Sequence, residues 1–342
     1  MRLGVIEGFY GRAWDDAVRL RMIDWCARLG FDAYLYAPKA DACLRRRWSE
    51  PWPDEEIDRL RALVHAGDRS GLEVVVGLSP FELYRSYDTR AQRLLRDCLA
   101  RISDAGVRSL ALLFDDMPGS IDALAARQAD IVNDAAGWAP WKALRVCPTY
   151  YSDDEVLDRV FGERPEAYLE DLGAKLPRAV SIFWTGPRVC SERVSVRHVA
   201  GVAERLQRPV ALWDNYPVND SRLRSGHLYL AALDSRDPGL ADHLESHWCN
   251  AMNQAALSLP ALASLPALFG RSGAIEQVLD EAGVSPALID ACLPLAAAHL
   301  DELTPPKIAE LRCLAAAPGQ AAIELGHWLD GVYRFDPACL TD

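Results

Sequence analysis

Two adjacent aspartates, Asp115 and Asp116, stand directly after an apolar run that begins at Ser109. A run that is apolar at consecutive positions predicts a strand buried on both faces, as in a parallel sheet. Ligands gather at the carboxyl ends of such strands, which is where this pair falls. Neighbouring strand residues point to opposite faces, so both carboxylates can face one cavity only if the chain bends, which Pro118 and Gly119 favour. Carboxylates this close would push one pKa upward, which leaves a proton donor beside an ionised group.

The same pair also fits a purely structural interpretation. Two aspartates before Met117-Pro118-Gly119 are good turn formers, and Asp116 would suit the N-terminal cap of a following helix. The pair alone does not separate the two interpretations, so the ends of the other predicted strands have to decide.

Polar or aromatic residues stand at the same end of nearly every predicted strand. The set comprises Glu7, Lys39, Asp115, Asp116, Tyr151, Trp184, Trp213, Asn215 and Asp220. In a barrel of parallel strands these positions converge on one pocket. Aromatic rings interleaved with carboxylates and amides suit a sugar, because the rings cover its apolar face and the polar groups bind its hydroxyls.

Several of these residues have simpler interpretations. Lys39 fits equally well as a surface lysine in a loop, and Trp213 as an aromatic cap on the core. His243 and His247 lie four residues apart in a predicted helix, so zinc binding has to be considered. Glu245 is misplaced for the His-Glu-x-x-His motif of a metalloprotease, which favours two histidines on a helix surface.

Strand and helix patterns alternate along most of the chain. The predicted strands are Leu3–Ile6, Asp32–Tyr36, Glu73–Leu78, Ser109–Phe114, Leu144–Cys147, Val180–Phe183, Pro209–Leu212 and a short candidate, Leu228–Leu230. The predicted helices are Trp14–Leu29, Glu55–Ala66, Arg90–Ser103, Ile121–Ala135, a looser region to Gly173, Val196–Leu206 and Leu240–Trp248. Eight strand–helix units in about 250 residues are typical of a (β/α)8 TIM barrel, an α/β fold. A doubly wound open sheet is the alternative, but no Gly-x-Gly-x-x-Gly follows the first strand.

After Gly270 the sequence becomes rich in alanine and leucine and shows no strand pattern. The predicted helices there are Ile275–Ala282, Pro286–Leu300, Pro306–Ala317 and Ala321–Leu329. We therefore expect a barrel domain of residues 1–270 and a small all-helical region of residues 271–342. The helical region would pack on the barrel or on a second copy of the chain, as in a homo-oligomer.

Composition limits the classes of partner. The chain has 342 residues, 50% hydrophobic and 25% charged, which is enough to bury a full core. A net charge of −12 argues against nucleic acid or an anionic membrane as partner. Nine cysteines without Cys-x-x-Cys spacing indicate reduced thiols in a cytoplasmic protein, with Cys26, Cys98 and Cys147 as core fillers. The apolar N-terminal segment meets Glu7 too early for a signal peptide, and prolines cut the longest apolar run, Ala255–Phe269, so no membrane span is expected.

With these residues identified, the chain resembles glycoside hydrolase family 84, the O-GlcNAcase and β-N-acetylglucosaminidase catalytic domain. The resemblance runs through most of residues 3–256. Its markers are Gly4-Val-Ile-Glu-Gly-Phe-Tyr-Gly11, Tyr36-Ala-Pro-Lys39, Leu113-Phe-Asp-Asp116, Cys147-Pro-Thr149, Trp184-Thr-Gly-Pro187, Trp213-Asp-Asn215 with Asn219-Asp220, and Asn250. Each motif is short, but their common order and spacing are specific.

The resemblance implies a (β/α)8 barrel that hydrolyses terminal β-N-acetylglucosaminides with retention, O-GlcNAc on protein included. The sugar's own 2-acetamido oxygen would be the nucleophile and close onto the anomeric carbon as an oxazoline, unlike the scheme in which the enzyme supplies a nucleophilic carboxylate. Asp115 would orient the acetamido N–H, and Asp116 would protonate the leaving oxygen and then deprotonate water. The implied substrate-binding residues are Gly8 through its backbone, Lys39, Asn215, Asp220 and Asn250 for the hydroxyls, and Tyr151 and Trp213 for the acetamido group. This chemistry needs no metal and no cofactor.

The chain departs from the family pattern around the leaving group. Ala40 replaces the first of two aspartates after Lys39, and Leu44 replaces a histidine. Phe81 replaces the glycine of Ser-Pro-Gly, and Leu-Gly-Pro-Tyr reads Leu230-Ala-Ala-Leu233. No catalytic group is lost, but the loops around the leaving group must differ from those of the family.

Two other functions stay open on the residues alone. The first is a metal-dependent hydrolase with Asp115 and Asp116 as ligands. The second is a barrel that binds glycans without cleaving them, although such a barrel has no need of the aspartate pair.

Overall fold

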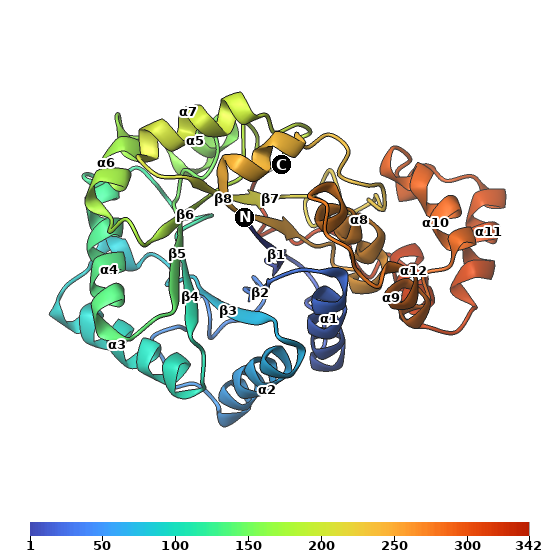
Figure 1. The fold of residues 1–342 in the computed structure, drawn as a ribbon, viewed down its shortest axis with the longest axis horizontal. Helices are drawn as coiled ribbons and strands as arrows, with labels where there is room; N and C mark the ends of the chain where they lie inside the picture. The colour runs from blue at the N-terminus through green and yellow to red at the C-terminus, as the bar shows by residue number, and fades with distance from the viewer. Residues whose placement is uncertain (342) are drawn as a thin grey trace.

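Parallel strands that are buried along almost their whole length form a closed barrel in the computed structural model, which describes residues 1–341 (Figure 1). In these residues the strands are β1 (Arg2–Glu7), β2 (Ala33–Tyr36), β3 (Glu73–Leu78), β4 (Ser109–Leu113), β5 (Ala143–Cys147), β6 (Ser181–Trp184), β7 (Val210–Asp214) and β8 (Leu244–Asn250). Each strand pairs with the next, and β8 pairs with β1 to close the ring. The prediction of a (β/α)8 barrel is confirmed.

Helices surround the barrel and extend beyond it. They are α1 (Asp16–Leu29), α2 (Asp54–Ser70), α3 (Thr89–Asp104), α4 (Leu124–Trp138), α5 (Glu155–Phe161), α6 (Tyr168–Lys175), α7 (Val196–Leu206), α8 (Ala255–Leu268), α9 (Ile275–Ala282), α10 (Pro286–Cys292), α11 (Pro305–Ala315) and α12 (Gln320–Leu329). Short 3-10 turns are η1 (Leu83–Arg85), η2 (Pro238–Asp242), η3 (Leu293–Ala296) and η4 (Leu300–Glu302). Side-chain caps fix where helices begin: Asp15 accepts from the backbone N–H of Val18 at α1, and Ser195 accepts from that of His198 at α7.

Large side chains fill the inside of the barrel. Trp248 of β8 is fully buried, and its ring lies against Gly4 of β1, where an added Cβ would come within 2.0 Å of the ring. Only glycine therefore fits at that point of β1. The ring of Phe183 contacts the rings of Trp248 and Trp213 edge-on, so the core supports Trp213, which lines the cavity described below.

The eighth strand is Leu244–Asn250, so the prediction of a strand over residues 228–230 and a helix over 240–248 is wrong. The sequence pattern did not indicate this strand, because Ser246 and His247 interrupt its apolar run. Both are nevertheless buried, and each has a hydrogen-bond partner: Ser246 accepts from the indole N–H of Trp248, and His247 pairs with Asp214 of β7.

The long apolar run after β8 forms one helix. Pro260 and Pro266 lie inside α8, so the prediction that they interrupt the run is wrong. The helix is apolar all round because α1, α9, α12 and β1 pack against it. In the part of the chain that the structure describes, no helix has the length and apolar character needed to cross a membrane.

The C-terminal helices lie together on one side of the barrel, beside α1 and α8 (Figure 1). Contacts run from α9 to α1 and α8, and from α12 to α8. The predicted helices here occur, except that the second ends at Cys292 and continues as a 3-10 turn. The division into residues 1–270 and 271–342 stays a prediction.

A buried carboxyl joins the C-terminal helices to the barrel. Glu324 of α12 is 2% exposed and accepts hydrogen bonds from the backbone N–H groups of Ala256 (2.9 Å) and Leu257 (3.1 Å), at the start of α8. The positive end of α8 favours a negative charge there. Burial is the stronger influence and raises the pKa of Glu324 to about 7.

We predict that Glu324→Gln removes a pH dependence of stability. Because the pKa is raised from 4.5 to about 7, the folded protein binds this proton more tightly than the unfolded chain. The contribution of Glu324 to stability is therefore complete below about pH 4.5 and is lost as the pH rises through 7. Glutamine keeps an acceptor without the charge, so the variant should gain up to ~3 kcal/mol at pH 9 but little at pH 4.5. Urea unfolding at both pH values checks this, and an equal difference at the two would contradict it.

Candidate active site

One cavity opens at the carboxyl end of the barrel. Every residue that the sequence predicts for catalysis or substrate binding lines it: Gly8, Lys39, Asp115, Asp116, Tyr151, Trp213, Asn215, Asp220 and Asn250. They come from the ends of β1, β2, β4, β5, β7 and β8 or from the loops that follow them. The barrel thus brings together residues that are far apart in sequence.

Two residues of the wider strand-end set lie elsewhere, so their predicted place in the pocket is wrong. Glu7 is the last residue of β1, and its fully buried side chain pairs with Arg19 of α1. Trp184 ends β6 in the core and donates its indole N–H to His198 of α7. Successive strand residues face opposite sides, and these two face the helices.

A bend at Asp116 lets both neighbouring carboxylates face the cavity. Asp116 has a φ of 56°, in the left-handed region that is rare for residues other than glycine. The turn after it is held by a hydrogen bond from the Tyr84 hydroxyl to the carbonyl of Pro118 (2.6 Å) and one from the N–H of Gly119 to Phe161 (2.7 Å). The bend was predicted at Pro118 and Gly119, but it occurs earlier, at Asp116, the second residue of the pair. The next helix begins at Leu124, so the interpretation of Asp116 as its cap is wrong.

Lys39 lies between the two aspartates. Its ammonium forms an ion pair with Asp115 and lies 3.5 Å from the Oδ2 atom of Asp116. The Lys39 side chain is only 5% exposed, so it is not the surface lysine that the sequence also allowed. Burial lowers the pKa of Lys39, but the two carboxylates outweigh it and the pKa is raised.

Both oxygens of Asp116 are held by phenols. Tyr10 donates to Oδ2 (2.8 Å) and Tyr151 donates to Oδ1 (2.9 Å). Burial alone would raise the pKa of Asp116, but Lys39, the two phenols and Arg45 outweigh it and lower the pKa. The sequence predicted an upward shift within the pair. For Asp116 the direction is the opposite, because a cation that sequence spacing does not reveal stands beside it.

Asp115 differs from its neighbour in one respect. Its Oδ2 atom is paired with Lys39, but its buried Oδ1 atom has no hydrogen-bond partner among residues 1–341. A buried acceptor without a donor costs about 1–3 kcal/mol, so the site gains when a ligand supplies an N–H or O–H group there.

A chain of amides lines the opposite wall. Asn215 accepts from the Trp213 indole N–H (3.0 Å) and from the Asn250 amide (3.0 Å), and it donates to the carbonyl of Val189 (2.9 Å). Asn250 in turn accepts from the backbone N–H of Gly8 (3.1 Å). These bonds fix the amides and the Trp213 ring in one orientation, which is what a site of defined shape requires.

Asp220 comes from the long loop between β7 and β8. It accepts from the backbone N–H of Tyr10 (2.7 Å), and burial raises its pKa to about 6. Asp220 is therefore ionised at neutral pH and begins to take up a proton in mildly acidic solution.

Sequence reasoning missed part of the lining. The additional residues are Tyr10, Cys147, Thr185, Val189, Cys190, Val218, Ser221, Cys339 and Thr341. Most are small or apolar residues in loops, which carry no recognisable pattern. Tyr10 could have been found, because it stands in the polar and aromatic stretch that closes the first strand.

Tyr10 connects three parts of the site. Its hydroxyl donates to Asp116 and accepts from the Nη2 atom of Arg45 (3.2 Å), while its backbone N–H holds Asp220. The guanidinium of Arg45 lies over the rings of Tyr10 and Phe81. Tyr10 therefore helps to set the pKa of Asp116.

We predict that Tyr10→Phe raises the pKa of Asp116. The lost hydrogen bond favours the ionised form, so its removal should shift the alkaline limb of kcat/KM upward by about one pH unit, if Asp116 is the group that must carry a proton. Tyr87→Phe is the matched control, because Tyr87 also donates to an aspartate, Asp134 (2.8 Å), outside the cavity. An alkaline limb that stays in place or moves down would contradict the role of Tyr10.

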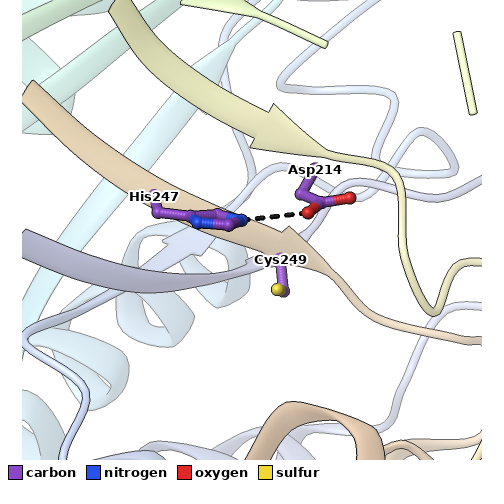
Figure 2. Close-up of side chains that lie close together, drawn as sticks. All are labelled: Asp214, His247 and Cys249. Atoms are coloured by element: carbon purple, nitrogen blue, oxygen red, sulfur yellow. Dashed lines mark hydrogen bonds and ion pairs between the residues drawn. The ribbon is translucent and has the colours of Figure 1, made fainter. Parts of the chain in front are cut away.

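The histidines do not form the predicted surface pair. His243 is exposed before β8, whereas His247 is fully buried in it, so the helix-surface interpretation is wrong for His247. Figure 2 shows His247 beside Asp214 and Cys249, whose ligand atoms all lie within 4.8 Å of one another. Arg236 already donates to both oxygens of Asp214 (2.6 and 2.7 Å) and, with His247, lowers its pKa to about 2 although burial opposes this. A metal ion bound by Asp214 would have to displace the Arg236 guanidinium. We therefore interpret the cluster as a structural ion pair and not as a metal site.

Comparisons with known proteins identify the family of the chain. The family model described as beta-N-acetylglucosaminidase matches residues 3–278. Protein O-GlcNAcase of Mus musculus and that of Rattus norvegicus are each 31% identical over 251 residues, which is 71% of this chain and 27% of theirs. The matched region thus spans about a quarter of the length of these relatives.

Solved structures of other proteins are also similar to this chain. An O-GlcNAc hydrolase of Thermobaculum terrenum, solved as an aspartate-to-asparagine mutant, has a TM-score of 0.72 and 25% identity, with 96% of this chain and 80% of that chain covered. A protein titled CpGH84B shares the fold with a TM-score of 0.72 and 24% identity, with 95% of this chain and 60% of that chain covered. Because the family model covers most of the chain, the chain belongs to the β-N-acetylglucosaminidase family, glycoside hydrolase family 84.

Proposed function

We propose that this chain is a retaining, exo-acting β-N-acetylglucosaminidase in which the substrate's acetamido oxygen is the nucleophile. In the first step that oxygen bonds to the anomeric carbon, the bond to the leaving oxygen breaks, and Asp116 gives its proton to the leaving group. In the second step a water oxygen bonds to the anomeric carbon, the bond from that carbon to the acetamido oxygen breaks and restores the acetamido group, and Asp116 takes up a proton of the water. Two inversions leave the configuration unchanged.

The unequal surroundings of the two aspartates carry this proposal. Asp115 has a buried Oδ1 atom without a partner in residues 1–341, which suits an acetamido N–H, and its charge balances the positive charge of the oxazolinium ion that ring closure forms. Asp116 has its oxygens held by Tyr10 and Tyr151, which places a proton carrier at a fixed point of the cavity. A turn-forming pair would need neither arrangement.

Lys39 explains how an aspartate with a lowered pKa can serve as an acid. Its ammonium lies 3.5 Å from the Oδ2 atom of Asp116. A sugar hydroxyl that takes up one N–H of Lys39 would draw the ammonium away from Asp116. The pKa of Asp116 would then rise when substrate binds, which is when a proton is needed.

The remaining lining residues suit a hexosamine. We assign Asn215, Asn250, Asp220 and the backbone of Gly8 to the sugar hydroxyls, and Trp213 and Tyr151 to the acetamido group. The curated relatives are named for the removal of O-GlcNAc from protein, so the leaving group that we propose is the hydroxyl of a serine or threonine, with simple aryl glycosides as model substrates.

The test compares two aryl glycosides that differ only at carbon 2 of the sugar. The β-N-acetylglucosaminide should be cleaved at least roughly 1,000-fold faster than the β-glucoside, since only the former carries the nucleophile. Comparable rates would contradict the proposal. Binding of N-acetylglucosamine without cleavage of any glycoside would favour the glycan-binding alternative.

The metal-dependent alternative makes a separate prediction. In this site the ammonium of Lys39 stands between the carboxylates, where a divalent ion that used both as ligands would have to lie. Treatment with a chelator should therefore leave turnover of the N-acetylglucosaminide unchanged, and a loss restored by added metal would favour the alternative.

A further inference from the structure

The chain returns to the active site after α12. Cys339 and Thr341 line the same cavity as Asp115 and Asp116, although they lie more than 60 residues beyond the end of the family match at residue 278. Thr341 is only 8% exposed, and its side chain interacts with that of Tyr151, whose phenol donates to Asp116. The segment 335–341, here called the strap, therefore reaches the catalytic carboxylates through one intervening side chain.

Little space is left beneath the strap. The cavity is open to solvent, and its volume is about 50 Å³, which is room for roughly four water molecules at 10–15 Å³ each. The side chains that the sugar must touch are correspondingly covered: Tyr151 is 5% exposed and Trp213 is 4% exposed.

A second, larger cavity of about 340 Å³ adjoins the first. The two share Val189, Cys190, Ser221 and Thr341, and the second continues along Arg224 and Tyr229. Thr341 thus stands where the two spaces meet. Thr341, which lines both cavities, interacts with Tyr151, and Tyr151 donates to Asp116, the proposed proton donor for the leaving oxygen.

The structure of the strap favours its displacement from the cavity. Its side chains Phe335 and Leu340 are 38% and 54% exposed although both are apolar, whereas Thr341, which follows Leu340, is buried. A turn, closed by a hydrogen bond from the N–H of Cys339 to the carbonyl of Asp336 (2.9 Å), shapes the segment locally. Segments that bury few apolar side chains open at low free-energy cost.

We propose that the strap is a specificity determinant that covers the leaving-group side of the active site. In its closed position the strap separates the active-site cavity from the second cavity and leaves no path for an extended peptide. Displaced, it joins the two spaces into one cleft that admits the sugar at one end and a peptide leaving group at the other. This inference rests on the proposed function only for the chemistry of the substrate, not for the covering itself.

The principal test is a variant that ends at Arg334. Its KM for an aryl β-N-acetylglucosaminide should fall about tenfold if the covered form holds roughly nine-tenths of the population, because apparent affinity scales with the open fraction. Its kcat/KM for a peptide carrying N-acetylglucosamine on serine or threonine should rise more than that for the aryl glycoside. Equal gains on both substrates would overturn the assignment of the strap to the leaving-group side.

Substitutions within the intact chain guard against a truncation that disturbs folding. Thr341→Glu adds a carboxylate to the cavity that Asp116 and Asp220 also line, and the repulsion should expel the strap and reproduce the truncation. Leu340→Ala is the matched control, because this exposed neighbour does not line the cavity, and it should behave as the parent chain. Thermal unfolding confirms that each variant is folded.

Hydrogen exchange separates failure of this inference from failure of the proposed function. Amides of residues 185–191 and 215–221 should exchange faster in the truncated chain, whatever the enzyme cleaves. Unchanged exchange together with unchanged KM would overturn the strap and leave the hydrolase proposal standing. Faster exchange without cleavage of any N-acetylglucosaminide would support the strap and count against the proposed function.

Discussion

Asp116→Asn should abolish most activity on substrates with a poor leaving group and much less on substrates with a good one. Asparagine cannot give a proton to the leaving oxygen, and general acid catalysis typically contributes roughly 100- to 10,000-fold. An alkyl N-acetylglucosaminide should therefore lose about this factor in kcat/KM. The phenolate of an aryl glycoside with an acidic phenol leaves without being protonated. The first step on that substrate should therefore be nearly unaffected by the substitution.

The matched control for this variant is Asp122→Asn. Asp122 lies six residues further along the same loop, is exposed and does not line the cavity, so its substitution should leave both substrates unaffected. Equal losses on the two leaving groups with Asp116→Asn would contradict the assignment of Asp116 as the acid.

Asp115→Asn should reduce activity on every substrate to a similar extent. Its carboxylate is proposed to orient the acetamido N–H and to balance the charge of the oxazoline, and neither task depends on the leaving group. Losing one preorganised electrostatic partner of a transition state typically costs roughly 100- to 1,000-fold in kcat. The measurement is kcat for the same alkyl and aryl pair used with Asp116→Asn.

The contrast between the two variants is more informative than either alone. A loss with Asp115→Asn that grows as the leaving group becomes poorer would mean that Asp115, not Asp116, supplies the proton. Among residues 1–341 the Oδ1 atom of Asp115 has no hydrogen-bond partner, whereas both oxygens of Asp116 accept from phenols. This difference predicts that the loss depends on the leaving group for Asp116→Asn and not for Asp115→Asn.

The barrel and the position of its site could be predicted because buried strands and their ends leave a strong pattern. The apolar run before Asp115 is uninterrupted, and polar residues such as Lys39 and Asn215 follow other strands at the matching point. Strand β8 could not be found in this way, because Ser246 and His247 are satisfied by partners that only the closed barrel supplies.

The electrostatics of the site depend on contacts that sequence spacing does not contain. The direction of the pKa shift of Asp116 follows from Lys39, Tyr10 and Tyr151, which are 77, 106 and 35 positions away in sequence, as their numbers show. Burial of Thr341 against Tyr151 likewise joins segments that no local pattern connects. Long-range packing, and not residue type, decides both.

The nucleophile is the central claim, and a series of substrates with one leaving group and progressively fluorinated N-acetyl groups tests it most directly. Each fluorine withdraws electrons from the acetamido oxygen, so kcat/KM should fall steeply and continuously along the series if that oxygen attacks the anomeric carbon. A rate that does not change with fluorination would show that another group attacks, and would contradict the account.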